Sequence, residues 1–213
     1  MRRAVTLCML RHRLRASEAL VIALSFCLTG CILTRGDDLT VSSKWPLGNG
    51  TSMKSKSIVL SVGTNNTNPR TLQLVEGQAQ KAYADSTLFS HVSVAKEPAD
   101  LIAEIQVRED GSKALAGISG FICGFTMGLI PGYANATLNM KTVFKSPSGS
   151  EIGSVKKSES VSMWMQLFLV FAMPFKDQPN HVIRDIYYDL NRATLDQALK
   201  DGYLLSEPRT QVQ

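Results

Sequence analysis

The sequence of 213 residues is poor in the side chains that most often carry out chemistry. It has four cysteines and three histidines, and none of them falls at a spacing typical of a zinc site. Four cysteines are also too few for a disulfide-dense scaffold. It contains no phosphate-binding loop and no Gly-x-Ser-x-Gly nucleophile motif. The sequence therefore predicts no catalytic residue, no metal site and no cofactor, and we expect the protein not to be an enzyme.

Positive charge is also scarce outside one segment. The net charge is +5, but the first 30 residues carry five arginines against one glutamate, and the rest of the chain carries 18 basic and 17 acidic residues. A nucleic-acid-binding domain would need a basic surface of its own. We therefore expect no nucleic acid partner.

The leading segment has the organisation of an export signal. A basic region, Met1–Glu18, is followed by an uncharged apolar stretch, Ala19–Leu28. An apolar stretch of about ten residues fits the 7–15 residues of a signal peptide and falls short of the roughly 20 that span a bilayer. We predict a signal peptide over residues 1–30.

The end of this segment, Leu28-Thr29-Gly30-Cys31, resembles the lipobox of bacterial lipoproteins. The resemblance implies cleavage between Gly30 and Cys31 and attachment of acyl chains, such as palmitate, at Cys31. Two or more acyl chains on one residue anchor a protein stably to a membrane. The next residue is Ile32 rather than an aspartate, which in the lipobox family implies the outer membrane. The expected protein is lipid-anchored there, with its domain facing the periplasm.

The chain after the signal divides into three parts by its hydrophobic pattern. Residues 31–56 carry the lipidated cysteine and a Ser/Thr/Gly-rich tether, residues 57–205 form the domain, and residues 206–213 are a tail. The patterns within the domain predict strands over 58–62, 92–94, 101–107, 136–145 and 152–161, a turn over 146–150, and helices over 68–85 and 179–200. Asn68 with Pro69 begins the first helix, and Gly202 ends the second.

This order of elements predicts an α+β fold. We expect a two-layer mixed sheet with helices on one face, and two apolar, partly helical inserts at one edge of the sheet.

The first insert lies in a stretch without charged residues between Lys113 and Lys141. Gly120, Gly124, Gly128 and Gly132 follow one another at four-residue spacing, and on a helix such a ladder of small residues lets another element approach closely. Three interpretations remain open for residues 114–134. They are a packed or membrane-dipping helix, a Gly-rich core loop, or a helix that spans the membrane.

The second insert, residues 163–175, is also uncharged. Trp164, Phe168, Phe171 and Phe175 would form an aromatic stripe if this segment were helical, and such a stripe most often faces a protein core. Because the hairpin over 135–162 turns at Ser148, its two ends lie side by side. We therefore expect the two inserts to meet in one packing or interaction edge.

A second resemblance extends over residues 57–205. The Gly-rich stretch ending Gly128-Leu129-Ile130-Pro131, the hairpin, and then Trp164 and Met173-Pro174-Phe175 before the last helix are similar to small proteobacterial outer-membrane lipoproteins. The expected function is that of a membrane-anchored lipoprotein that binds or scaffolds an envelope protein or lipid through 114–134 and 163–175. The alternatives are an envelope hydrolase acting on cell wall or lipid, and an integral membrane protein spanning at 114–134.

Overall fold

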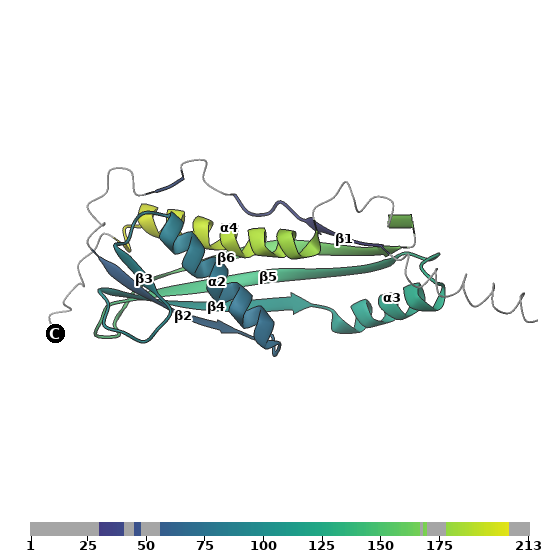
Figure 1. Cartoon of the computed structure of the whole chain (residues 1–213), viewed down its shortest axis with the longest axis horizontal. Helices are drawn as coiled ribbons and strands as arrows, with labels where there is room; N and C mark the ends of the chain where they lie inside the picture. Colours follow the sequence, from purple (N-terminus) through teal and green to yellow (C-terminus); the bar gives the residue numbers. More distant parts are fainter. Residues whose placement is uncertain (1–29, 41–44, 48–55, 167, 170–177, 205–213) are drawn as a thin grey trace, which may run out of the picture. The chain divides into compact units, whose positions relative to one another are not determined.

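The computed structural model describes residues 30–40, 45–47, 56–166, 168–169 and 178–204 (Figure 1). Several predictions made from the sequence lie outside these residues. They concern the signal peptide up to residue 29, the tail over 206–213, and the aromatic residues Phe171 and Phe175 of the second insert.

Six strands form one mixed sheet in the order β1-β6-β5-β4-β2-β3. β2 pairs in parallel with both β3 and β4, and β4 pairs antiparallel with β5. Together with the helices, this sheet confirms the predicted α+β class. The strands are β1 (Gly30–Arg35), β2 (Ser57–Thr64), β3 (His91–Ser93), β4 (Leu101–Gly111), β5 (Gly132–Lys145) and β6 (Glu151–Gln166).

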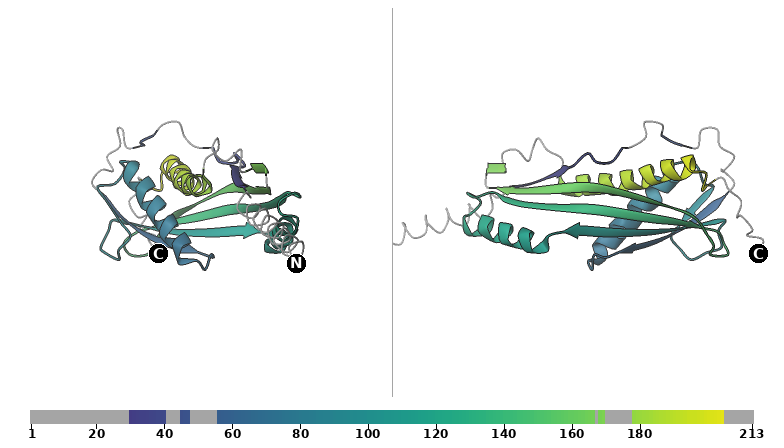
Figure 2. Two further views of the ribbon diagram at one scale, coloured as in Figure 1. Left: turned by 45° about the vertical axis from the view of Figure 1, so that its right-hand side comes forward. Right: turned by 180° about the vertical axis from the view of Figure 1, so that it is seen from behind.

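Two helices, α2 (Pro69–Asp85) and α4 (Pro179–Lys200), lie side by side on one face of the sheet (Figures 1 and 2). The Tyr188 hydroxyl of α4 donates a hydrogen bond of 2.9 Å to Asp85 at the end of α2. This arrangement agrees with the predicted layer of helices on one side.

The ends of both helices follow from local signals in the sequence. The Asn68 side chain accepts a hydrogen bond of 3.0 Å from the Arg70 backbone N–H, which satisfies one of the free amides at the start of α2. Beyond α4, Gly202 adopts a left-handed conformation with φ of 76°, and the N–H of Tyr203 returns to the carbonyl of Ala198. This is the glycine-ended helix terminus that Gly202 predicts.

The core lies between the sheet and these helices. Along β4 the side chains alternate, with Ala103, Ile105 and Val107 buried and the residues between them partly or fully exposed. Fully buried large side chains from the strands and helices complete this core. They are Ile58, Leu60, Tyr83, Leu88, Met140, Phe144, Ile186, Leu190 and Leu195.

The chain divides into two compact units. Among the described residues, unit 1 comprises 30–33, 112–134, 163–166, 168–169 and 178–179, and unit 2 comprises the remainder. Both predicted inserts therefore belong to unit 1, and so does Cys31. The described parts of the two inserts are in contact, as the sequence predicts.

The first residues of the expected tether form a strand instead. In unit 2, the Gly36 N–H donates to the Ser160 carbonyl at 2.9 Å and the Thr34 hydroxyl donates to the Ser162 carbonyl at 3.3 Å. These partners run in opposite directions, so β1 lies antiparallel to β6. The pattern of residues 31–35 shows little of this, because the partner strand supplies the hydrogen bonds.

The first insert forms α3 (Lys113–Phe125), which has 13 residues. The chain then turns and enters β5 at Gly132, so residues 114–134 are a short helix, a turn and the start of a strand. The interpretations as a core loop and as one spanning helix are therefore wrong. Among the described residues, no helix is long and apolar enough to cross a membrane. In the second insert, Trp164 lies in β6 rather than in a helix.

Candidate functional site

The predicted lipidation residue, Cys31, is the second residue of β1, directly after the predicted cleavage residue Gly30. Its side chain is partly buried, and this burial raises the pKa of the thiol. Continuing the antiparallel register of β1 and β6 toward the start of β1 brings Cys31 level with Met165. The lipidation residue thus belongs to the part of the sheet that packs against α3.

Local capping defines α3. The Ser112 hydroxyl accepts a hydrogen bond of 3.2 Å from the Leu115 N–H at the start of the helix. At the other end, the Gly128 N–H returns to the Cys123 carbonyl at 2.7 Å, and Met127 takes a left-handed φ of 53°. This is a Schellman-type end, which stops the helix and sends the chain back toward β5.

Small side chains form the face of α3 that packs within unit 1. The Ser119 hydroxyl accepts a hydrogen bond of 2.6 Å from the Tyr133 N–H, and the Cys123 thiol donates to the Met165 carbonyl at 3.4 Å. An added Cβ at Gly120 would be 3.9 Å from the end of the Met165 side chain. The helix backbone can therefore lie close to β5 and β6.

The predicted glycine ladder takes part in this contact at some positions only. At Gly132 an added Cβ would be 3.0 Å from the Cys123 Cβ, which is too close for an alanine without movement. Gly120 also lies at the contact, whereas no atom lies within 4 Å of an added Cβ at Gly124. Gly128 lies in the turn after α3, with φ of 78°. The four glycines therefore do not form one continuous contact stripe.

Aromatic rings gather in the same unit. The Trp164 and Tyr133 rings lie 4.7 Å apart and are tilted against each other, and Phe121 and Phe125 stack with their centroids 6.2 Å apart. Trp164 and Phe168, predicted for the interaction edge, are 45% and 58% exposed, so neither is a core residue.

The large side chains of α3 and its turn point away from the packed face. Phe121 is 73% exposed and Phe125 is 80% exposed, in a stretch without a charged residue. In the described part of unit 2, only Val94 is a comparably exposed large hydrophobic residue. We call the exposed large hydrophobic residues of unit 1 the apolar surface: Leu115, Ile118, Phe121, Ile122, Phe125, Met127, Leu129, Ile130, Tyr133, Trp164 and Phe168.

Sequence reasoning missed an ionic cluster in unit 2. Arg35 of β1 places Nη1 2.7 Å from Asp189 Oδ2 on α4 and Nε 3.5 Å from Glu159 Oε1 on β6. The Glu159 side chain is completely buried. Burial alone would lower the pKa of Arg35, but the hydrogen bond and charge of Asp189, with those of Glu159, raise it. A signal existed: Glu159 stands at an inward position of β6 between buried Val155 and Val161, and this requires a buried partner.

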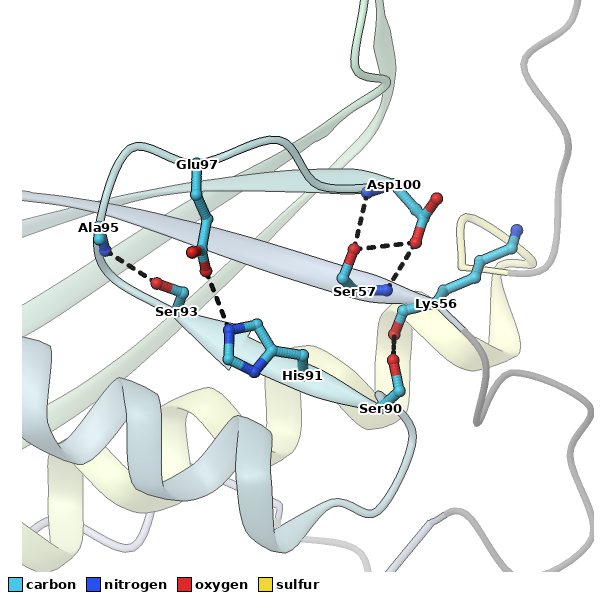
Figure 3. A network of polar contacts seen from close by, with 8 residues as sticks. All are labelled: Lys56, Ser57, Ser90, His91, Ser93, Ala95, Glu97 and Asp100. Carbon is cyan, nitrogen blue, oxygen red and sulfur yellow. Dashed lines mark hydrogen bonds and ion pairs between the residues drawn. The ribbon is translucent and has the colours of Figure 1, made fainter.

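A second polar network lies at the ends of β2, β3 and β4 in unit 2 (Figure 3). The Ser57 N–H and hydroxyl donate to Asp100 Oδ2 at 2.7 and 2.9 Å, and these bonds lower the pKa of Asp100. His91 Nε2 lies 2.9 Å from Glu97 Oε1, and hydrogen bonds from Ser93 and then His91 lower the pKa of Glu97. These contacts hold the loop between β3 and β4 against β2 and β3.

The described residues bring together no group of three or more His, Cys, Asp or Glu side chains that could hold a metal ion. Within them, Cys31 and Cys123 are both free thiols, and the Cys123 side chain is buried. The outstanding surface feature of the described chain is therefore the apolar surface of unit 1.

Comparisons with known proteins bring only distant likenesses. No family model and no curated protein matches the chain. Among solved structures, it is similar to two crystal forms of the PelC dodecamer from Paraburkholderia phytofirmans. The likenesses have 10% and 9% identity and TM-scores of 0.37 and 0.36, covering 78% and 84% of this chain and 97% and 99% of PelC. A candidate lipoprotein from Caulobacter crescentus CB15 is similar at 12% identity and a TM-score of 0.28, over 68% of this chain and 92% of that one. At these values the likeness assigns no activity.

Proposed function

We propose that this chain is a lipid-anchored protein of the bacterial outer membrane. Acyl chains on Cys31 attach it to the membrane, its folded units face the periplasm, and it binds or scaffolds an envelope component without catalysing a reaction. The observation that carries the proposal is the apolar surface, which belongs to the same compact unit as Cys31.

An exposed surface of this kind supports a binding role. Soluble monomers rarely expose contiguous apolar patches larger than a few hundred Å², and larger ones mark sites for protein or membrane contact. Burying one large apolar side chain stabilises a complex by about 1.5–3 kcal/mol, so even a few of these residues would bind a partner appreciably. Phe121 and Phe125 offer the largest exposed fractions.

The start of β1 supports the membrane attachment. The lipobox resemblance makes Cys31 the first residue of the mature chain, and β1 already includes it. The acyl chains would therefore leave directly from a strand of unit 1 rather than from the end of a long tether. Unit 1 would be held at the membrane surface, because two acyl chains give stable anchoring.

The proposal is tested with Cys31→Ser in the full-length chain, using Cys123→Ser as the matched control. We expect intact-mass spectrometry to show acyl chains and a cleaved signal in the parent protein and in the Cys123→Ser protein, and neither in the Cys31→Ser protein. Separation of inner and outer membranes on a density gradient should place the parent and control in the outer membrane. An unmodified Cys31 thiol in the parent protein would refute the anchor.

A further inference from the structure

α3 distributes its side chains in the reverse of the usual order. A helix on the surface of a soluble protein turns its large apolar residues inward and polar residues outward. In α3 the small residues Ser119, Gly120 and Cys123 pack inward, and Phe121 and Phe125 face out. Small residues at the contact and large apolar residues outside is the arrangement that helices adopt when lipid is the surrounding solvent.

The charge pattern favours lipid over a protein partner. Protein interfaces have a polar rim, whereas charged side chains are strongly disfavoured in the hydrocarbon region. The chain has no charged residue between Lys113 and Lys141, and this stretch includes all of α3 after its first residue and the turn that follows. A partner of lipid therefore matches the composition of the whole apolar surface.

The length of α3 determines how it can enter a membrane. Thirteen residues rise about 20 Å, which is less than the hydrocarbon core of about 30 Å. The turn at Met127 and Gly128 then returns the chain to β5. The helix and its turn can therefore enter one leaflet at the interface, as interfacial helices do, without crossing the bilayer.

The position of Cys31 identifies the leaflet. It is level on β1 with Met165 of β6, and the Met165 carbonyl accepts the hydrogen bond from Cys123 of α3. We propose that the apolar surface inserts into the same membrane leaflet that holds the acyl chains of Cys31, as a second attachment of unit 1. The inference rests on the proposed function and names lipid as the component that this surface binds.

The test measures how deeply the apolar surface enters a membrane. Lipidated full-length protein, processed in cells, is reconstituted into vesicles of phosphatidylethanolamine and phosphatidylglycerol with brominated acyl chains, which quench nearby tryptophan. Trp45→Phe and Trp164→Phe remove the native indoles, and Phe121→Trp provides the reporter. The matched control is Val94→Trp in the same background, because Val94 is the exposed apolar residue of unit 2.

We expect the tryptophan at position 121 to lose about half of its fluorescence, since interfacial helices bury their apolar face about 5–10 Å into the membrane. The tryptophan at position 94 should lose little. If mass spectrometry shows acyl chains on Cys31 but position 121 is not quenched, the inference fails and the proposed anchor stands. Equal quenching at both positions also overturns the inference, and an unmodified Cys31 overturns both.

A measurement in cells keeps the inference open to refutation if the tryptophan variants do not fold. A photoreactive benzoylphenylalanine at position 121 conserves an aromatic side chain, and its adducts identify what the apolar surface touches. Adducts with phospholipid support insertion. A discrete adduct with a protein, or with a second copy of this chain, overturns it.

Discussion

Arg35 is the residue whose loss we expect to destabilise unit 2 most. It joins β1 to β6 and α4 through Glu159 and Asp189, at 3.5 and 2.7 Å. Asp189 has a second partner, Arg192 Nη1 at 3.4 Å, whereas Arg35 supplies the one ion pair that the described residues give to Glu159. Arg35→Ala would therefore leave the Glu159 carboxylate buried without a countercharge.

The magnitude follows from the burial of Glu159. Its side chain is 0% exposed, and within the described structure its Oε2 atom has no hydrogen-bond partner. Removing one member of a buried ion pair destabilises a protein by about 3–5 kcal/mol. Arg35 is itself 26% exposed, so water can partly replace it, and we expect a loss near 3 kcal/mol for Arg35→Ala.

Urea unfolding followed by tryptophan fluorescence measures this loss. Trp45 lies 4.8 Å from the Arg192 guanidinium and 6.5 Å from the Tyr188 ring, so it reports on unit 2 near the cluster. A Trp164→Phe background removes the signal of unit 1. The matched control is Arg184→Ala on the exposed side of α4, which should change the free energy of unfolding by no more than about 0.5 kcal/mol.

A double variant separates the ion pair from the loss of packing. Replacing both partners, as Arg35→Met with Glu159→Leu, removes the buried charge together with its countercharge. The free energy of unfolding should then return to within about 1 kcal/mol of the parent value. If Arg35→Ala costs less than about 1 kcal/mol, or if the double variant is no more stable than Arg35→Ala, the reasoning is refuted.

Two further outcomes follow from the structure. Gly132→Ala should destabilise unit 1, because its Cβ would approach the Cys123 Cβ to 3.0 Å, whereas Gly117→Ala, in open space on α3, should stabilise it by about 1 kcal/mol; thermal melts that gave both variants the same sign would contradict this. The pKa of Asp100 is lowered by the bonds from Ser57, so its contribution to stability is full above its ordinary value of about 3.8 and is lost as the pH falls through the lower folded value. The difference in melting temperature between the parent and Asp100→Asn should therefore be constant near neutral pH and shrink below about pH 4, and a difference that grows with acid would exclude it.

The elements that the sequence predicts well carry their signals within themselves. α2 and α4 have helical periodicity, a capping Asn68 and a terminating Gly202, all within a few residues of the helix ends. β4 shows strict alternation of buried and exposed residues. Such signals depend on backbone geometry alone, so no knowledge of distant parts of the chain is needed.

β1 and the face of α3 depend on residues far away in the sequence. The contacts of β1 join residues 124 and 128 positions apart, and a short segment such as residues 30–35 does not reveal them. For α3, the composition predicts an apolar element but not which side packs inward. That choice depends on where Met165 and Tyr133 approach the helix, and they prefer its small residues because only these allow close contact.

The placement of Gly30 and Cys31 in β1 gives maturation a necessary order under the proposed function. A peptidase needs these two residues free in its own active site, and a strand already docked on β6 cannot offer them. The stretch that becomes β1 emerges first from the translocation machinery, while its partner strand follows more than a hundred residues later. Leader removal and acylation therefore precede closure of the sheet, and the edge strand docks last, drawing the folded body against the bilayer as it does so.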